Sequence, residues 1–146
     1  MKFSTLLKLM RIWPPFLGAG ISVKSFSADF TSITVQMKMR FWNKNYVGTH
    51  YGGSIYSMTD PFYMLMLMQL LGKGYIIWDK SASIRYKKPA KGTIYAKFEL
   101  PLEQVEKIRQ QVEQEQKIQP AFLIELTNEA GEVVAEINKT LSITKK

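Results

Sequence analysis

The stretch from Ser54 to Leu71 most limits what this chain can fold into. Its only charged side chain is Asp60, and the run from Pro61 to Leu71 is apolar nearly all round. A helix without a polar face has to be wrapped by a sheet or by a partner. A transmembrane span needs about 20 apolar residues, and this run is shorter and starts with a carboxylate and a proline. We therefore predict a buried central helix and no transmembrane segment.

Elsewhere, alternating apolar and polar residues predict strands that are buried on one face. The alternation is clearest from Ile33 to Phe41 and returns from Ile94 to Leu100 and from Val133 to Ile143, where Lys139 interrupts the apolar set. Weaker strand patterns cover residues 21–26, 81–86 and 121–127, and residues 128–131 are typical of a hairpin turn. An amphipathic surface helix is predicted to begin near Pro101.

Six or so mostly antiparallel strands and one apolar helix favour an α+β architecture, a curled antiparallel sheet wrapped around the helix. The 146 residues fit a single domain, 1–146, with 1–20 as an N-terminal helix or extension. Lys8 and Arg11 interrupt the apolar run of that segment, which argues against a secretory signal and for a cytoplasmic chain. We expect a short amphipathic helix that packs on the domain and is stopped by Pro14 and Pro15, with membrane-surface attachment as the alternative.

The residue inventory narrows the possible chemistry. The chain has no cysteine and one histidine, His50, so disulfides, cysteine nucleophiles and zinc or iron sites are not expected, and no cofactor is predicted. Catalysis would rest on carboxylates, hydroxyls, amides and the backbone. The net charge of +8 favours an anionic partner, namely nucleic acid, an anionic membrane or a phosphorylated ligand. Because no basic stripe carries interleaved aromatic residues, nucleic acid is not the predicted partner.

One segment, Asn45 to Asp60, combines a glycine-rich turn, a helix start and a carboxylate. Gly52 and Gly53 let a ligand approach backbone amides at the first turn of a helix, where an oxyanion is stabilised. Asp60 follows about two turns later and Ser57 lies between them, so a continuous helix places all of them near one face. An apolar environment would make Asp60 more basic, as a general base or nucleophile requires.

Asp60 also has a purely structural interpretation. Asp60-Pro61 is typical of an N-cap followed by proline at the first helical position, in which case Asp60 only starts a helix from Phe62 to Leu71. The residues alone leave both interpretations open.

The stretch Gly52-Gly-Ser-Ile-Tyr-Ser-Met-Thr-Asp60 resembles the small-acyl thioesterases of the hot-dog superfamily. In that superfamily an Asn, a His-Gly-Gly turn and an acidic residue eight positions after the first Gly recur. Three longer motifs, Trp13-Pro-Pro-Phe-Leu-Gly-Ala-Gly-Ile21, Trp42-Asn-Lys-Asn-Tyr-Val-Gly-Thr-His-Tyr-Gly-Gly53 and Met58-Thr-Asp-Pro-Phe-Tyr-Met64, are similar to the hot-dog branch known as domain of unknown function 4442.

The resemblance implies roles for individual residues. Asp60 matches the catalytic carboxylate, Gly52 the amide that polarises the thioester carbonyl, with Gly53 beside it, and Asn45 the amide side chain that orients the reacting group. It also implies an obligate homodimer, or a dimer of dimers, in which carboxylate and amide face each other across the interface. Tyr51 departs from the pattern, because it occupies the usual histidine position and displaces His50 by one.

Further residues are candidate substrate ligands, each with a structural alternative. Asp79 is expected either near the site or, with Trp78, in packing, and Lys87 and Lys88 either on coenzyme A phosphates or simply solvated. His50 is a candidate ligand that would otherwise form structural hydrogen bonds. The complete substrate-binding set comprises Thr49, His50, Tyr51, Ser57, Asp79, Lys87 and Lys88.

We therefore expect an acyl thioesterase that acts on acyl-CoA or on acyl-carrier-protein thioesters, with coenzyme A present only as part of the substrate. The alternative is a non-catalytic acyl- or lipid-binding hot-dog protein, which the Tyr51 departure and the apolar helix favour. A hot-dog dehydratase would need a histidine paired with a carboxylate, for which His50 is the only candidate.

Overall fold

A computed structural model describes residues 1–146. Six strands follow one another in the order β1-β2-β4-β6-β7-β3, and the short β5 pairs with β7. All the strand pairs are antiparallel. The strands are β1 (Ile21–Phe26), β2 (Ser32–Met37), β3 (Tyr75–Tyr86), β4 (Ile94–Glu99), β5 (Lys117–Ile118), β6 (Ala121–Thr127) and β7 (Val133–Lys145).

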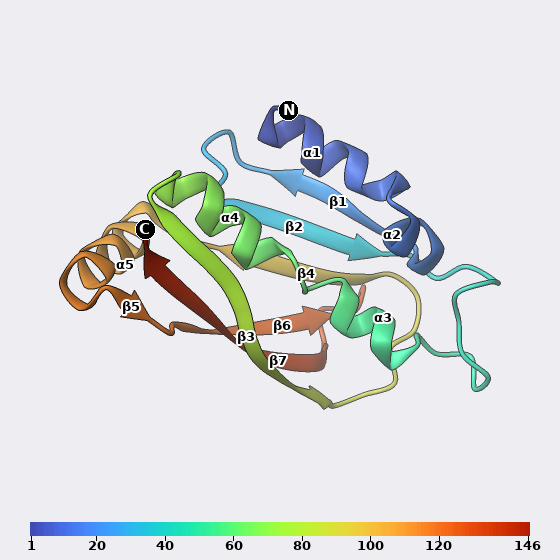
Figure 1. The fold of residues 1–146 in the computed structure, drawn as a ribbon. Helices are drawn as coiled ribbons and strands as arrows, with labels where there is room; N and C mark the ends of the chain where they lie inside the picture. The colour runs from blue at the N-terminus through green and yellow to red at the C-terminus, as the bar shows by residue number, and fades with distance from the viewer.

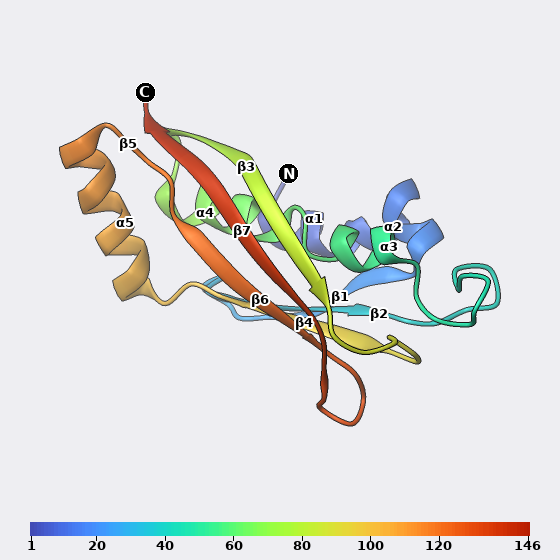
Figure 2. The same ribbon diagram turned by 90° about the horizontal axis from the view of Figure 1, so that it is seen from below.

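The sheet curls around α4 (Phe62–Leu71), and α3 (Gly52–Ser57) precedes α4 on the same side of the sheet (Figures 1 and 2). Five α4 side chains are buried, from Phe62 to Leu71, as an apolar helix of this kind requires. The predicted α+β architecture, a curled antiparallel sheet wrapped around an apolar helix, is therefore confirmed, and it is the hot-dog fold.

The surface helix α5 (Leu102–Glu115) lies at one end of the molecule, and it begins directly after Pro101 as predicted. It buries Val105, Ile108 and Val112. From this helix, Arg109 donates hydrogen bonds to the carbonyl oxygens of Leu70 and Leu71, at 3.1 and 3.0 Å. Arg109 thereby satisfies carbonyls that the last turn of α4 leaves without a helical partner.

Most predicted strands are confirmed, β1 and β6 with the predicted bounds. The hairpin turn at 128–131 is also present, with Gly131 at φ 81°. The strand expected from Ile33 to Phe41 is too long, because β2 ends at Met37. Met37 is paired with Ile21 of β1 and Ile94 of β4, so the chain beyond it has no neighbouring strand on either side. Conversely, the strand expected from residue 81 already starts at Tyr75, where it pairs with the end of β7.

The N-terminal segment packs on the fold, as expected, but it is more than one helix. It consists of α1 (Phe3–Leu9), the 3-10 turn η1 (Met10–Ile12) and α2 (Pro14–Ala19). The expectation that Pro14 and Pro15 only stop a helix is wrong, because the two prolines occupy the first positions of α2, where a missing N–H costs nothing. Leu7, Met10 and Phe16 are its buried contacts.

The apolar stretch is also not one continuous helix. It forms α3 and α4, separated by a turn at residues 58–61, so helical spacing does not carry over from Gly53 to Asp60. None of the helices has the length and apolar character that crossing a membrane requires.

Candidate active site

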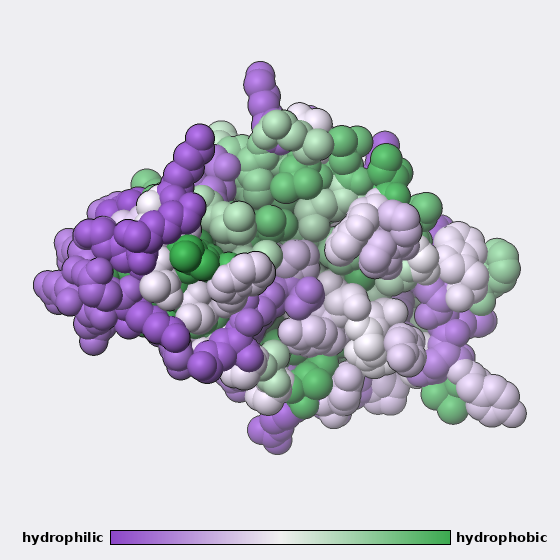
Figure 3. All heavy atoms as spheres, in the orientation of Figure 1, coloured by the Kyte–Doolittle hydropathy of each residue, from purple (hydrophilic) through white to green (hydrophobic).

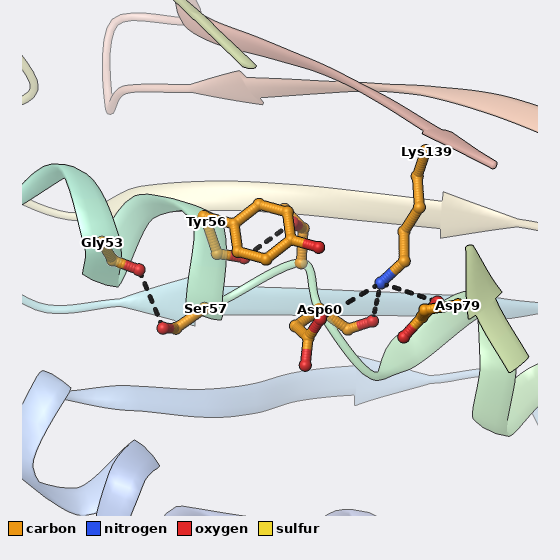
Figure 4. Close-up of polar contacts among 7 residues, drawn as sticks. Gly53, Tyr56, Ser57, Asp60, Asp79 and Lys139 are labelled. Atoms are coloured by element: carbon orange, nitrogen blue, oxygen red, sulfur yellow. Dashed lines mark hydrogen bonds and ion pairs between the residues drawn. The ribbon is translucent and has the colours of Figure 1, made fainter. Parts of the chain in front are cut away.

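A buried lysine lies behind the turn between α3 and α4. Lys139, in the middle of β7, has no exposed surface, and its ammonium donates a hydrogen bond to the backbone carbonyl of Asp60. Its Nζ lies 3.5 Å from Asp60 Oδ1 and 3.1 Å from Asp79 Oδ1. Figure 4 shows both carboxylates converging on this one nitrogen. A buried ammonium needs such partners, since an unpaired charge in the interior is strongly unfavourable.

Sheet topology brings these three residues together. Asp79 belongs to β3, which pairs with β7 along its whole length, and Asp79 is opposite Leu141 in the register. Asp60 lies in the turn between α3 and α4, which packs against this sheet. Its side chain is 52% exposed and that of Asp79 is 31% exposed, so each carboxylate reaches water on one side and the ammonium on the other. The negative charge therefore stays accessible to a ligand while its position is fixed from within.

Tyr56, at the end of α3, completes the cluster. Burial raises the pKa of Tyr56 to about 12, and the charge of Asp60, a hydrogen bond to Asp60 and the charge of Asp79 act in the same direction. The Lys139 ammonium also lies 5.8 Å from the centre of the Tyr56 ring. Tyr56 thus remains a neutral phenol and a hydrogen-bond donor at physiological pH.

Neither interpretation of Asp60 as a helical residue survives unchanged. Because α3 ends at Ser57, Asp60 is not an interior helical residue on the face of the glycines. Helix α4 does start at Phe62, but Pro61 is its N-cap and no side chain caps it. The Asp60 carboxylate is directed to Lys139 instead. Its exposure also means that the apolar surroundings we expected to make it more basic are replaced by a half-solvated ion pair.

The glycines at the start of α3 lie against two exposed tyrosine side chains. A Cβ on Gly52 would lie 2.9 Å from the Tyr86 hydroxyl, which donates to the Gly52 carbonyl, and a Cβ on Gly53 would lie 2.6 Å from the Tyr51 ring. The backbone amides of both glycines, at the first turn of α3, have no hydrogen-bond acceptor. Ser57 donates to the Gly53 carbonyl at 2.8 Å, so its hydroxyl is tied back to α3.

A hollow of about 340 Å³ collects several predicted site residues near this helix start. Asn45, Thr49, His50, Gly52 and Lys88 all line it. The Asn45 side chain organises the loop in front of the hollow, because its Oδ1 accepts from the amides of Val47 and Thr49 and its Nδ2 donates to the Thr49 hydroxyl. Asn45 therefore shapes the hollow through its own loop.

His50 fastens this loop to the chain that follows β3. It is 3% exposed, its amide donates to Ala90 at 2.9 Å, and its Nε2 lies 2.6 Å from the Gly92 carbonyl. A carbonyl only accepts, so Nε2 carries a proton. The opposite nitrogen, Nδ1, is buried and has no partner. The structural role considered for His50 is thus present.

The remaining candidates lie at the surface. Lys87 and Lys88 form ion pairs with Glu136 and Glu132, and both lysines are exposed. Trp78 is 67% exposed and does not pack in the core of its own chain, whereas its neighbour Asp79 joins the cluster around Lys139. Tyr51 is exposed and covers Gly53.

The predicted residues thus fall into two groups. One consists of Asp60 and Asp79 on Lys139. The other surrounds the hollow at the start of α3 and includes Gly52. Asp60, Ser57 and Asp79 do not line that hollow.

Sequence reasoning missed Lys139 and Tyr56. Lys139 left a signal, because it is the one charge in the buried set of an otherwise alternating strand. A charge at such a position implies a buried partner. Tyr56 left none, because its contact with Asp60 depends on the break between α3 and α4.

The chain belongs to the family described as domain of unknown function (DUF4442), whose model matches residues 2–143. Among solved structures, a Pseudomonas aeruginosa protein of unknown function, described as a probable thioesterase, superposes with a TM-score of 0.86 at 18% identity, over 100% of this chain and 97% of that one. A Chlorobaculum tepidum protein of unknown function superposes with a TM-score of 0.78 at 18% identity, over 98% of this chain and 94% of that one. A Haemophilus influenzae thioesterase gives 0.71 at 14% identity, over 99% and 92%. No curated protein sequence matches this chain.

Proposed function

We propose that the protein hydrolyses acyl thioesters with Asp60 as the catalytic carboxylate. The observation that carries the proposal is the Lys139 ammonium, which holds Asp60 by its backbone carbonyl and its side chain while half of that side chain stays exposed. Such an arrangement keeps a negative charge fixed at a surface that a substrate can reach. The names of two similar structures, a probable thioesterase and a thioesterase, support the same reaction class.

In the reaction, the Asp60 carboxylate removes a proton from a water molecule that attacks the thioester carbon, or attacks that carbon itself. The Gly52 and Gly53 amides donate to the oxygen that becomes negative. The thiolate then leaves as the C–S bond breaks. Where Asp60 itself attacks, this step leaves an anhydride on its carboxylate, which water then hydrolyses. The neutral Tyr56 phenol lies beside this carboxylate, whose charge helps to raise the Tyr56 pKa.

The two groups of residues combine in a homodimer. Within one chain, Asp60 lies outside the hollow lined by Gly52, which supports a site assembled from two subunits. The edge strand β3 pairs only with β7, so its other side is free for a partner. Lys88 at the hollow suits an anionic carrier, coenzyme A or the phosphopantetheine of an acyl carrier protein.

The test is turnover of a panel of acyl-CoA thioesters of increasing chain length, followed by release of free thiol. Asp60→Asn should lower kcat/KM by about a hundredfold or more. It should leave stability intact, because Asp79 still neutralises Lys139. Glu103→Gln, which removes an exposed carboxylate from α5, is the matched control and should be fully active. Equal rates for the Asp60→Asn variant and the wild type would refute the proposal.

A second candidate, binding of an acyl chain without turnover, is favoured by Tyr51. This side chain occupies the usual histidine position and covers Gly53, beside the amides that would hold the oxyanion. Tyr51→His would then create turnover that the wild type lacks. If the wild type already hydrolyses thioesters in an Asp60-dependent manner, this candidate is eliminated.

A further inference from the structure

The charge of the chain is unevenly distributed along its sequence. Residues 1–59 contain seven lysines and arginines against a single carboxylate, Asp29, and so carry +6 of the formal +8. All seven cations are exposed and none forms a salt bridge. The site proposed above uses none of them. The seven are Lys2, Lys8, Arg11, Lys24, Lys38, Arg40 and Lys44.

Large apolar side chains are exposed in the same part of the fold. Six of them, on α1, η1, α2 and the loop after β2, are between 44% and 84% exposed: Leu9, Ile12, Trp13, Leu17, Phe41 and Trp42. Figure 3 shows apolar atoms gathered over α1 and α2, whereas the end of the molecule that carries α5 is hydrophilic. Six exposed residues of this size form more apolar surface than scattered single side chains would.

The basic and apolar residues adjoin one another in two hollows. An apolar hollow of about 420 Å³ between α1 and α4 includes Leu9, Ile12 and Trp13. A second hollow of about 480 Å³ shares Ile12 and adds three cations with no carboxylate, and its basic members are Arg11, Lys38 and Arg40. We call the six apolar residues and these three cations the N-terminal patch.

The loop that carries four of the nine patch residues is held by hydrogen bonds of Asn43. Asn43, almost fully buried, donates from Nδ2 to the carbonyls of Ala19 and Lys38, at 2.9 and 2.8 Å. Its Oδ1 accepts from the Arg40 amide at 2.7 Å. Gly20, at φ 78°, lies so close that a Cβ would be 2.6 Å from Asn43 Nδ2. This loop carries Phe41 and Trp42, whose rings are 5.1 Å apart, and Trp42 lines the second hollow together with Leu17 of α2.

We infer that the N-terminal patch docks the protein on an anionic lipid bilayer. Aliphatic and indole side chains between unpaired cations match a membrane surface, where hydrocarbon receives the former and lipid phosphates the latter. Nucleic acid fits less well, because Leu9, Ile12 and Leu17 neither stack on bases nor bind phosphate. A second copy of the chain fits less well too, since it would bring like charges together. The patch lies at the β1 end of the sheet, away from the free edge of β3.

The experiment is sedimentation of the full chain with vesicles of phosphatidylcholine, either alone or mixed with phosphatidylserine. Binding should require phosphatidylserine and weaken as salt is added. Neutralising the patch in Arg11→Gln/Lys38→Gln/Arg40→Gln should weaken binding on the order of a hundredfold, at ~1 kcal/mol for each basic residue. The control variant Lys73→Gln/Lys107→Gln/Lys117→Gln removes the same amount of charge from the end of the molecule that carries α5. It should bind the vesicles almost as tightly as the wild type.

Insertion of the apolar residues is tested separately. The chain has three tryptophans, and Trp78→Phe leaves only Trp13 and Trp42, both in the patch. Their fluorescence should be quenched by vesicles that contain brominated lipid. Phe41→Ser/Trp42→Ser should reduce sedimentation with all charges intact. Both patch variants should unfold at the same midpoint as the wild type, so that a loss of vesicle binding cannot come from a loss of fold.

Four results would overturn the inference. One is no sedimentation with phosphatidylserine vesicles at low salt. Another is an equal loss of binding in the control variant, which would mean that only net charge matters. The third is vesicle binding without quenching of the tryptophans. The fourth is displacement of the vesicles by an oligonucleotide that binds the Phe41→Ser/Trp42→Ser variant as tightly as the wild type, since the apolar part of the patch would then have no role.

Discussion

At the scale of single residues, Lys139 and its two carboxylates differ in how much solvent they reach. The ammonium is fully buried, whereas Asp60 and Asp79 are 52% and 31% exposed. Removing both carboxylate charges leaves a buried cation uncompensated, but removing the lysine leaves two anions that water can still solvate. Loss of both carboxylates should therefore destabilise the fold more than loss of the lysine.

Asp60→Asn/Asp79→Asn should lower the free energy of unfolding by about 3 kcal/mol. Lys139→Met alone should cost less, and adding Lys139→Met to the double variant should restore most of the loss. Urea unfolding of the three variants and the wild type measures these differences. If Lys139→Met is the most damaging change and rescues nothing, the lysine is held by packing and not by charge.

Tyr56 gives a pH dependence with a defined sign. Its pKa of about 12 in the folded chain lies above the ordinary value of 10.0. The stability it contributes is therefore complete below about pH 10 and is lost as the pH rises towards 12. The wild type should lose unfolding free energy more steeply over this interval than Tyr56→Phe. Equal pH dependence of the unfolding free energy in the wild type and in Tyr56→Phe would contradict the raised pKa of Tyr56. An absorbance titration of tyrosinate that Tyr56→Phe leaves unchanged near pH 12 would contradict it as well.

At the scale of elements, Arg109 of α5 secures the end of α4 through Leu70 and Leu71. Arg109→Met keeps the apolar stem but leaves both carbonyls without this donor, and should cost about 1.5 kcal/mol. Lys117→Met is the control for loss of a surface cation. Hydrogen exchange should speed up in the last turn of α4 and not in β2. Unchanged exchange there would show that water replaces the guanidinium at no cost.

Element type was predictable where one face is buried, and element ends were predictable only where the chain itself supplies the signal. Pro101 and Gly131 mark ends locally. Met37 does not, because β2 stops where its partners on both sides stop, and pairing is invisible in one sequence. The Asp60 carboxylate was found from its spacing to Gly52, but the break between α3 and α4 moved it off the predicted helical face.

At the scale of the whole molecule, the residues of the proposed site fall into two groups within one chain. Gly52 lines the hollow beside α3, and Asp60 belongs to the Lys139 cluster. The proposal therefore requires two chains, and it predicts a dimer in solution from a chain of 16.8 kDa. Sedimentation equilibrium measures this mass, and a monomer with full thioesterase activity would contradict it.

The N–H group of Gly52 can be removed by substitution with little other change to the backbone. Gly52 is the first residue of α3, where proline is tolerated, and Tyr51 before it has the extended backbone that proline requires. In a Tyr86→Phe background, which removes the hydroxyl 2.9 Å from the new Cβ, Gly52→Pro lacks the N–H and Gly52→Ala keeps it. The proline variant should lose on the order of a hundredfold in kcat relative to the alanine variant.

We propose that Asp60 of one subunit acts with the Gly52 amide of the other. The most direct test of this proposal mixes two inactive proteins, Asp60→Asn and the Gly52→Pro variant, under conditions that exchange subunits. Each mixed dimer then contains one site with both groups intact, so random exchange should restore about a quarter of the wild-type thioesterase activity. If the mixture stays as inactive as its parents although mixed dimers have formed, the two groups do not act across the subunit interface.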